Sequence, residues 1–307
     1  MADRIGGFRT PEAAAHYYER YDDMVARLWP VAHDELDVPT RFGTTHVRRS
    51  GPAHGTPLVL IHPTTGSSAG WYPLIAALSE HRPVYTPDTI GTVGRSVQTA
   101  PIRSPHDLVA WVDDVLDGLG LDAIHLLGYS EGGWIVALHA ALADRPERLT
   151  TLTLIEPGGA IERVPRRLVA SMILRGAGTL LARDKHRAFR EFNQWMNGDV
   201  ELSDDEIDLF LLAFRTFRQK LPTPGVLSDD ELRRITVPTL LLLAADTRLY
   251  DPEKVAARAH RLLPDVCVEI IPDAGHGVLF QYPDQLTARI LQFIESDHER
   301  AATARPT

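Results

Sequence analysis

A serine between two glycines is the residue pattern with the clearest chemical meaning in this sequence. Gly128-Tyr129-Ser130-Glu131-Gly132 fits the pattern G-x-S-x-G, in which glycines permit a turn too tight for neighbouring Cβ atoms. An apolar run precedes the motif and an apolar helical pattern follows it, which predicts a sharp strand-to-helix turn. Such a turn pushes the hydroxyl of Ser130 out over the strand ends, where helix N-terminal amides face developing negative charge. Ser130 is therefore the predicted nucleophile.

The elements that would position this serine alternate between short apolar runs and helical patterns, which is typical of parallel βα units. The predicted buried strands are 57–61, 83–86, 123–127, 152–155, 237–243 and 266–271. The predicted core helices are 71–78, 104–119, 134–142 and 284–295. Ser104-Pro105 is a good helix start, with a capping hydroxyl and a proline in the first turn. The pattern indicates a mostly parallel sheet.

The alternation stops at Pro157 and does not resume until about Gly225. Three helical stretches fill this interval, at 164–181, 185–196 and 204–220. Insertions in α/β sheets can overhang the site that forms at the strand ends, so we expect a helical cap; helical padding on the sheet is the alternative. Large apolar residues of this block offer surface to an apolar substrate, although for most of them we favour a place in the core: Leu180, Leu181, Phe189, Phe192, Trp195, Phe210, Phe214 and Phe217.

Five segments in this order resemble the α/β-hydrolase superfamily, over about residues 40–296. They are the first buried strand, His62-Pro63, the segment Asp88–Ser96, the motif around Ser130, and Asp273-Ala274-Gly275-His276-Gly277. Two departures from the usual pattern prevent assignment to a subfamily. His62-Pro63 stands where His-Gly is usual, and the Asp-x-x-Gly-x-Gly segment carries one extra residue. The resemblance implies an α/β-hydrolase core of the serine-nucleophile branch with a helical cap.

The resemblance also implies a general base and an oxyanion hole. His276 follows the last predicted strand, where this superfamily presents the imidazole that takes the serine proton and returns it to the leaving group. The loop His62–Gly66 follows the strand that supplies half of the oxyanion hole, so the backbone N–H groups of Thr64 and Glu131 are the candidate donors. We interpret His62 as a packed structural histidine rather than a base.

Two carboxylates satisfy the chain order serine, acid, histidine. Asp246 follows the strand that ends near Leu243, where most members keep their aspartate; measured from Pro238, however, the usual spacing falls on Thr247. Glu156 ends the strand 152–155, where haloalkane dehalogenases and some lipases carry their acid, and it fits that register without a gap. We favour Glu156 over Asp246.

Composition excludes several other functions. The 307 residues are 44% hydrophobic and 24% charged, as in a soluble globular protein. A net charge of −9 without a long basic stripe makes nucleic acid an unlikely partner. The single cysteine, Cys267, allows no intrachain disulfide and agrees with a cytoplasmic setting. We find no targeting segment, no membrane-spanning run and no cofactor or metal motif, and therefore expect no membrane partner and no cofactor.

The predicted fold is α/β, with an α/β-hydrolase core at 41–157 and 226–297 and a helical cap at 158–225. Residues 1–40 are predicted to form an N-terminal helical extension with a helix at about 11–28, and residues 298–307 a flexible tail. The serine nucleophile argues for chemistry at a carbonyl, since dehalogenases and epoxide hydrolases of this superfamily use aspartate. The predicted function is hydrolysis of an ester, lactone or thioester of a small, largely apolar molecule through an acyl-enzyme. The alternatives are C–C bond hydrolysis of a diketone and a non-hydrolytic binding or tailoring protein of the same fold; the sequence leaves the oligomeric state open.

Overall fold

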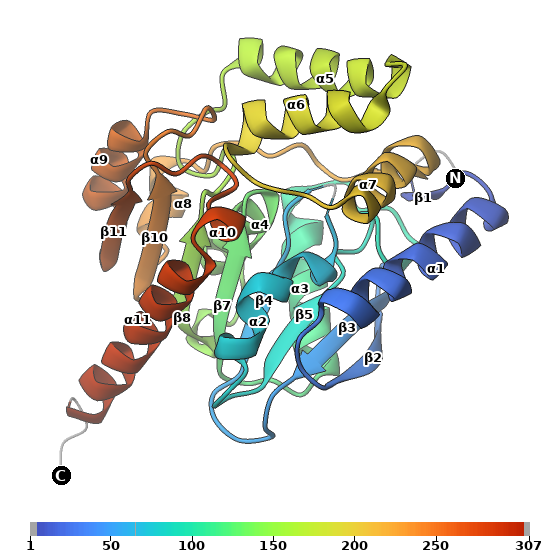
Figure 1. Ribbon diagram of the computed structural model, residues 1–307. Helices are drawn as coiled ribbons and strands as arrows, with labels where there is room; N and C mark the ends of the chain where they lie inside the picture. The colour runs from blue at the N-terminus through green and yellow to red at the C-terminus, as the bar shows by residue number, and fades with distance from the viewer. Residues whose placement is uncertain (1–4, 65, 304–307) are drawn as a thin grey trace.

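The computed structural model describes residues 5–64 and 66–303, with side chains as far as residue 296. Within these residues a nine-stranded sheet runs through the molecule in the order β11-β10-β8-β7-β4-β5-β3-β2, with β6 paired to β3 (Figure 1). The strands from β5 to β11 along this order pair in parallel, whereas β2, β3 and β6 pair antiparallel. The predicted α/β class with a mostly parallel sheet is confirmed.

The strands of this sheet are β2 His33–Thr40, β3 Gly43–Ser50, β4 Leu58–Ile61, β5 Val84–Pro87, β6 Val97–Gln98, β7 Ile124–Tyr129, β8 Leu149–Ile155, β10 Thr239–Ala244 and β11 Val266–Ile271. The helices around it are α1 Pro11–Leu28, α2 Tyr72–Leu78, α3 Pro105–Gly118, α4 Glu131–Leu142, α8 Asp229–Arg233, α9 Pro252–Leu262, α10 Val278–Gln281 and α11 Pro283–Thr303. Two short 3-10 helices, Ser68–Trp71 and Pro146–Arg148, complete the core.

Helices cover both faces of the sheet and give two apolar cores. One core joins the sheet to α3, α4, α8 and α9 and contains Trp111, Trp134 and Val255. The other joins the opposite face to α1, α2 and α11 and contains Trp71 and Ile290. The central strands β4, β7 and β10 are buried along their whole length, as parallel strands covered on both faces must be. This burial explains why their sequences are predominantly apolar.

Helix α3 shows how closely the local sequence signals match the structure. The Ser104 hydroxyl accepts a hydrogen bond from the Asp107 N–H at 3.3 Å, and the Asp107 carboxylate accepts one from the Ser104 N–H at 3.0 Å. This reciprocal capping box, with Pro105 in the first turn, fixes the start of the helix. Strand β11 occupies the predicted residues 266–271.

The N-terminal part differs from the helical extension expected over residues 1–40. Helix α1 is present at 11–28, but β2 extends the main sheet back to His33, ahead of the expected core boundary at residue 41. Strands β2 and β3 carry polar residues at most positions, including Arg48, which is fully buried. Their sequence therefore lacks the apolar run by which the other strands are recognised.

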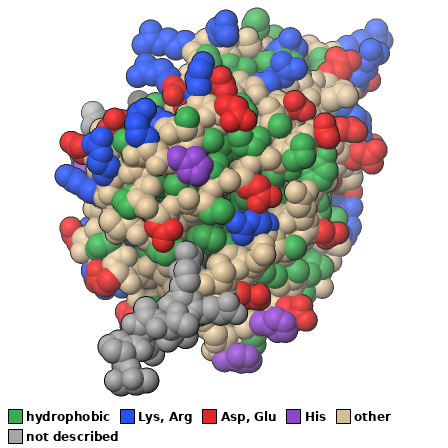
Figure 2. Space-filling view, turned by 90° about the vertical axis from the view of Figure 1, so that its left-hand side faces the viewer, with side chains coloured by type: hydrophobic (Ala, Val, Ile, Leu, Met, Phe, Trp, Pro, Cys, Tyr) green, Lys and Arg blue, Asp and Glu red, His purple; other side chains and the backbone are tan. Residues whose placement is uncertain are grey.

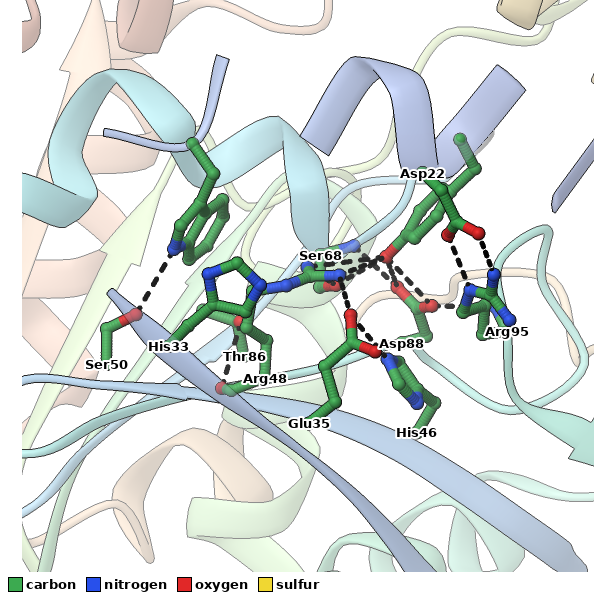
Figure 3. Close-up of polar contacts among 12 residues, drawn as sticks. Asp22, His33, Glu35, His46, Arg48, Ser50, Ser68, Thr86, Asp88 and Arg95 are labelled. Atoms are coloured by element: carbon green, nitrogen blue, oxygen red, sulfur yellow. Dashed lines mark hydrogen bonds and ion pairs between the residues drawn. The ribbon is translucent and has the colours of Figure 1, made fainter. Parts of the chain in front are cut away.

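Helix α1 is anchored to the core by a buried polar cluster (Figure 3). The Tyr21 hydroxyl lies 3.1 Å from the Ser68 hydroxyl and 3.3 Å from the Asp88 carboxylate. Arg48 donates to Tyr21 and to Ser68, and its guanidinium lies over the ring of Trp29 at 5.0 Å. Since Arg48 and Asp88 are both buried, these contacts compensate two charges removed from water.

A helical insert lies between β8 and β10, at the carboxyl ends of the parallel strands (Figure 1). It consists of α5 Arg166–Leu181, α6 Lys185–Asn197, α7 Asp204–Thr216 and the short strand β9 Phe217–Arg218. Strand β9 pairs with β1, Gly7–Phe8, and Arg20 of α1 forms an ion pair with Asp205 of α7 at 3.0 Å. The N-terminal segment therefore connects the insert to the core.

The apolar residues expected to face a substrate divide between several environments. Leu180, Phe189, Phe192 and Phe210 belong to a small core within the insert. Trp195 and Phe217 pack at the edges of the two main cores, and Leu181 and Phe214 are exposed. Six of the eight therefore pack in apolar cores, four of them within the insert, as the core interpretation of these residues expects.

Helix α11 continues to Thr303, beyond its predicted end near Glu295. The expected flexible tail at 298–307 therefore begins within this helix, whose last turns are rich in alanine, a strong helix former. Residues 304–307 lie outside the described part of the chain. Among the described residues, no helix is long and apolar enough to cross a membrane.

Replacing Tyr21 by Phe tests the anchor of α1. The substitution removes a hydroxyl that contacts Ser68, Asp88 and Arg48 in a buried setting, so the free energy of unfolding should fall by about 1–2 kcal/mol. Tyr18→Phe is the matched control, because the Tyr18 hydroxyl makes no hydrogen bond with the described residues, and its effect should stay within about 0.5 kcal/mol. Urea unfolding of both variants measures the difference; equal losses would contradict the anchoring role.

Candidate active site

Ser130 stands in a strained turn between β7 and α4. Its backbone has φ 55° and ψ −116°, a conformation that residues other than glycine rarely adopt. Backbone hydrogen bonds hold the turn: the Ser130 N–H donates to the Ile155 carbonyl at 3.0 Å, and the Ser130 carbonyl accepts from Gly158 at 3.0 Å and from Trp134 at 3.1 Å. The predicted strand–turn–helix setting of the motif is therefore present.

The glycines of the motif are required by close backbone approaches. A Cβ on Gly132 would lie 2.1 Å from the Ile61 carbonyl oxygen of the neighbouring strand, and one on Gly128 would lie 2.3 Å from the Gly132 carbonyl oxygen. Real Cβ atoms do not reach these distances, so only glycine lets helix α4 begin directly against β4 and β7. The sequence-level reason for the two glycines is confirmed.

His276 approaches Ser130 from the loop between β11 and α10. Its Nε2 atom lies 3.0 Å from the Ser130 hydroxyl, and its Nδ1 atom lies 3.0 Å from a carboxylate oxygen of Glu156. Because a carboxylate only accepts hydrogen bonds, Nδ1 carries the proton and Nε2 is left to accept from the serine. The Ser130 and His276 side chains meet in a nearly closed site, since the two residues are only 8% and 7% exposed.

Glu156 occupies the end of β8, next to the end of β7 that carries Ser130. The residue is fully buried and has φ 45°, which turns its side chain toward the histidine loop. Its carboxylate accepts from the Ala244 N–H at 2.8 Å, the Thr247 hydroxyl at 2.5 Å and the Tyr250 hydroxyl at 3.2 Å, besides His276. Four donors from three segments thus satisfy one buried carboxylate, as burial of a charge requires.

Asp246, the other carboxylate considered from the sequence, does not join this group. Its side chain is exposed, and its backbone N–H donates to the Ala274 carbonyl at 2.8 Å. Thr247, where the usual spacing would place an aspartate, points inward and donates to Glu156. The loop after β10 keeps the usual register, so the position facing the site is Thr247 and Asp246 turns to solvent.

Two buried tyrosines brace the group. The Tyr129 hydroxyl donates to the backbone carbonyl of His276 at 2.5 Å, and the Tyr250 hydroxyl donates to Glu156. Burial, and then the nearby charge of Glu156, raise the pKa of both phenols far above the ordinary range, so both remain donors. Neither tyrosine was recognised from the sequence, although Tyr129 lies inside the serine motif.

The described residues of the loop after β4, 62–64 and 66–68, are held at both ends by the residues that follow β5. The Thr89 N–H donates to Nε2 of His62 at 2.9 Å, and the Ser68 N–H donates to the Asp88 carboxylate at 2.7 Å. The Nδ1 atom of His62 therefore carries the proton and faces the Pro63 carbonyl at 2.8 Å, and burial lowers the pKa of this imidazole. His62 is thus a neutral structural residue, as expected.

Thr64 and Glu131, the two residues expected to supply oxyanion donors, share a polar contact through Gln219. The Thr64 hydroxyl donates to the Gln219 side-chain oxygen at 3.3 Å, and the Gln219 amide donates to Glu131 at 3.3 Å. Burial raises the pKa of Glu131, against the opposing effect of hydrogen bonding to its carboxylate by the side chains of Thr64 and Gln219. Gln219, in the segment that leaves the insert, was not identified from the sequence because no motif marks it.

The insert also contacts the histidine loop. The Gly277 N–H donates to the Asn197 carbonyl at 3.0 Å, and a Cβ on Gly275 would lie 2.7 Å from the same oxygen. Arg248, just after Thr247, donates to the Trp195 carbonyl at 2.8 Å. The carboxyl end of α6 therefore packs against the loops that carry His276 and Thr247, and the glycines beside His276 allow this approach.

An α/β-hydrolase is defined by a mostly parallel sheet that carries a serine in a strand-to-helix turn. In this protein that serine contacts a histidine, and the histidine is paired with a carboxylate at a strand end. Residues 58–289 match the Alpha/beta hydrolase family, and the chain belongs to that family. Among the described residues, no group of three or more His, Cys, Asp or Glu side chains is placed to hold a metal ion.

Two known proteins and one solved structure similar to this chain carry esterase names. The chain is 32% identical to Carboxylesterase YbfK of Bacillus subtilis over 302 residues, which cover 94% of this chain and 96% of that protein. It is 31% identical to the uncharacterized carboxylesterase nap of the same organism, over 92% of this chain and 93% of that one. The crystal structure of naproxen esterase (carboxylesterase NP) from Bacillus subtilis superposes with a TM-score of 0.83 at 30% identity, covering 93% of this chain and 99% of that chain.

Glu131→Gln tests the buried carboxyl beside Ser130. A raised pKa means that the folded protein holds this proton more tightly than the unfolded chain does, so this group's contribution to stability falls as pH rises above the ordinary range of a glutamate. Glutamine cannot ionise, so the stability of Glu131→Gln relative to the unmodified protein should increase between about pH 4 and about pH 8.

Chemical unfolding at both pH values measures the change, and Glu147→Gln, on an exposed side chain, is the matched control. The same pH-dependent gain in both variants, or no gain in Glu131→Gln, would count against a raised pKa of Glu131.

Proposed function

We propose that this protein is a serine carboxylesterase in which Ser130 is the nucleophile, His276 the general base and Glu156 the acid that orients the histidine. The observation that carries the proposal is the continuous hydrogen-bonded array from Glu156 through His276 to Ser130, with 3.0 Å at each contact. Similarity to two carboxylesterases over nearly the whole chain favours an ester over the other carbonyl compounds considered.

In the proposed reaction, the Ser130 oxygen attacks the ester carbonyl carbon while Nε2 of His276 takes its proton. The carbonyl oxygen becomes an oxyanion in a tetrahedral intermediate. When the intermediate collapses, the alcohol leaves with the proton from Nε2 and the acyl group stays on Ser130. A water molecule, deprotonated by the same nitrogen, then attacks the acyl-enzyme; when this second tetrahedral intermediate collapses, the acid leaves and Nε2 returns the proton to the Ser130 oxygen. Glu156 stabilises the imidazolium that forms in each step.

The backbone N–H groups of Thr64 and Glu131 are the proposed oxyanion donors. Glu131 directly follows the nucleophile at the first turn of α4, where helix amides have no partner within the helix. Thr64 belongs to the loop that Asp88 and Thr89 hold at both ends, which gives the preorganisation such donors need.

We propose a small ester with a largely apolar acyl group as the substrate, and the helical insert as a cap that restricts access. Ser130 and His276 are nearly buried, so access of the reacting carbonyl depends on the segments that cover them. A solved structure similar to this chain is that of a naproxen esterase, which places a naproxen ester among the first substrates to test. The contacts of α6 with the histidine loop support a role of the insert in controlling this access.

Ser130→Ala tests the central assignment. The variant keeps the turn and the fold but lacks the nucleophile, so hydrolysis of p-nitrophenyl esters and of a naproxen ester should fall by about three orders of magnitude or more in kcat. Circular dichroism verifies the fold, and the unmodified protein assayed on the same ester panel is the reference. A folded Ser130→Ala protein with near-normal turnover would refute the proposed mechanism.

Glu156→Gln and Asp246→Asn form a matched pair, because both replace a carboxylate by an amide of equal size. The Glu156 variant should lose a factor on the order of 10⁴ in kcat, since an amide favours the wrong histidine tautomer. The exposed Asp246 variant should keep its rate and lie within about 0.5 kcal/mol in stability. A severe loss in Asp246→Asn together with a mild Glu156→Gln would reverse the assignment of the acid.

A further inference from the structure

Helix α5 of the insert turns large apolar side chains toward solvent. Ile173, Leu174 and Leu181 are 67%, 74% and 86% exposed, and Val169 is 42% exposed. These are four of the six exposed large hydrophobic residues found in the described part of the chain. Soluble proteins seldom gather such residues on one helix unless that surface is covered by a partner.

The exposed apolar residues form a stripe. Ala170, Ile173, Leu174, Ala177 and Leu181 are all exposed and follow the spacing i, i+3, i+4, i+7 and i+11, so they share one face of α5. The opposite face carries Thr179, which is buried, and Met172, which packs at the edge of the main core. Met172 and Leu180 of α5 pack inward, so the exposed residues form a second apolar face that points away from the protein. We call this face the outer stripe.

Positive charge accompanies the outer stripe. Residues 163–190 contain eight Lys and Arg and one Asp, a net charge of +7 in a chain whose total is −9. Arg163, Arg166, Arg167 and Arg183 are exposed, and none forms an ion pair with a residue that the structure describes. Figure 2 shows Lys and Arg side chains gathered along the top of the molecule, with hydrophobic side chains between them. This is the end of the molecule at which Figure 1 places α5.

We infer that α5 docks this protein peripherally on an anionic lipid surface. An apolar helix face flanked by arginines matches the boundary of a bilayer, where the stripe enters the acyl region and the guanidinium groups pair with lipid phosphates. A second copy of the chain fits less well, because a two-fold contact through α5 would bring two clusters of unpaired arginines together. Peripheral docking needs no spanning segment, so it departs from the expectation of no membrane partner that composition suggested.

Vesicle sedimentation of the full chain tests this inference without using any enzymatic activity. The unmodified protein should sediment with vesicles of phosphatidylcholine containing about 30% phosphatidylglycerol, remain in the supernatant with phosphatidylcholine alone, and be released by salt. A serine variant should no longer bind the vesicles; it combines Ile173→Ser, Leu174→Ser and Leu181→Ser. An arginine variant should bind the anionic vesicles about a hundredfold more weakly; it combines Arg163→Gln, Arg166→Gln and Arg167→Gln.

Matched controls use exposed residues outside the insert. One control, Val97→Ser, removes an exposed apolar residue of β6. The other control changes the net charge by the same amount as the arginine variant and combines Arg103→Gln, Arg234→Gln and Arg261→Gln. Both controls should bind anionic vesicles as the unmodified protein does, and thermal unfolding shows whether each variant is folded.

Three results would overturn the inference. One is an unmodified protein that stays in solution with anionic vesicles at low salt. Another is equal binding of the arginine variant and its control. The third is a dimer in light scattering that the serine variant dissociates, since a second copy would then cover the outer stripe.

Discussion

The fully buried carboxylate of Glu156 is the constraint on which the candidate site depends. A charge removed from water must be compensated locally, and here the compensation comes from Ala244, Thr247, Tyr250 and His276. These donors belong to β10, to the loop that follows it and to the loop after β11. One carboxylate thus fixes the relative positions of three segments at the same edge of the sheet, and the histidine tautomer follows from it.

Sheet topology explains why residues far apart in sequence meet at this edge. Strands β7 and β8 are parallel neighbours, so their carboxyl ends deliver Ser130 and Glu156 side by side, each in a backbone conformation with positive φ. Such strained residues persist only where the surrounding structure over-determines them. Here the Ser130 N–H is held by Ile155 and the Glu156 N–H by Leu242, each through a backbone hydrogen bond to the adjacent strand.

The parts of this arrangement that could be predicted are those with a local signal. The turn at Ser130 is predicted by glycines between an apolar strand and an apolar helix. Glu156 is favoured because it falls at the end of its strand in the register of the family pattern, without a gap. The parts that could not be predicted depend on tertiary contacts. Arg48 and Tyr21 lie in polar or amphipathic segments, and their burial depends on each other and on Asp88. Gln219 reaches Glu131 from 88 residues away, and Asn197 meets the histidine loop only through folding of the insert. Thr247 shows the limit of spacing arguments, because the position that faces the site holds a hydroxyl that donates to Glu156 and not a carboxylate.

The central claim is that Glu156 and His276 make Ser130 nucleophilic, and covalent labelling by a fluorophosphonate tests it most directly. The account predicts a single phosphonyl adduct, located on Ser130 by mass spectrometry of peptides. It also predicts that labelling is slowed by orders of magnitude in folded His276→Ala protein, because the serine then has no base. An adduct on another residue, or equal labelling rates in the unmodified and His276→Ala proteins, would contradict the account.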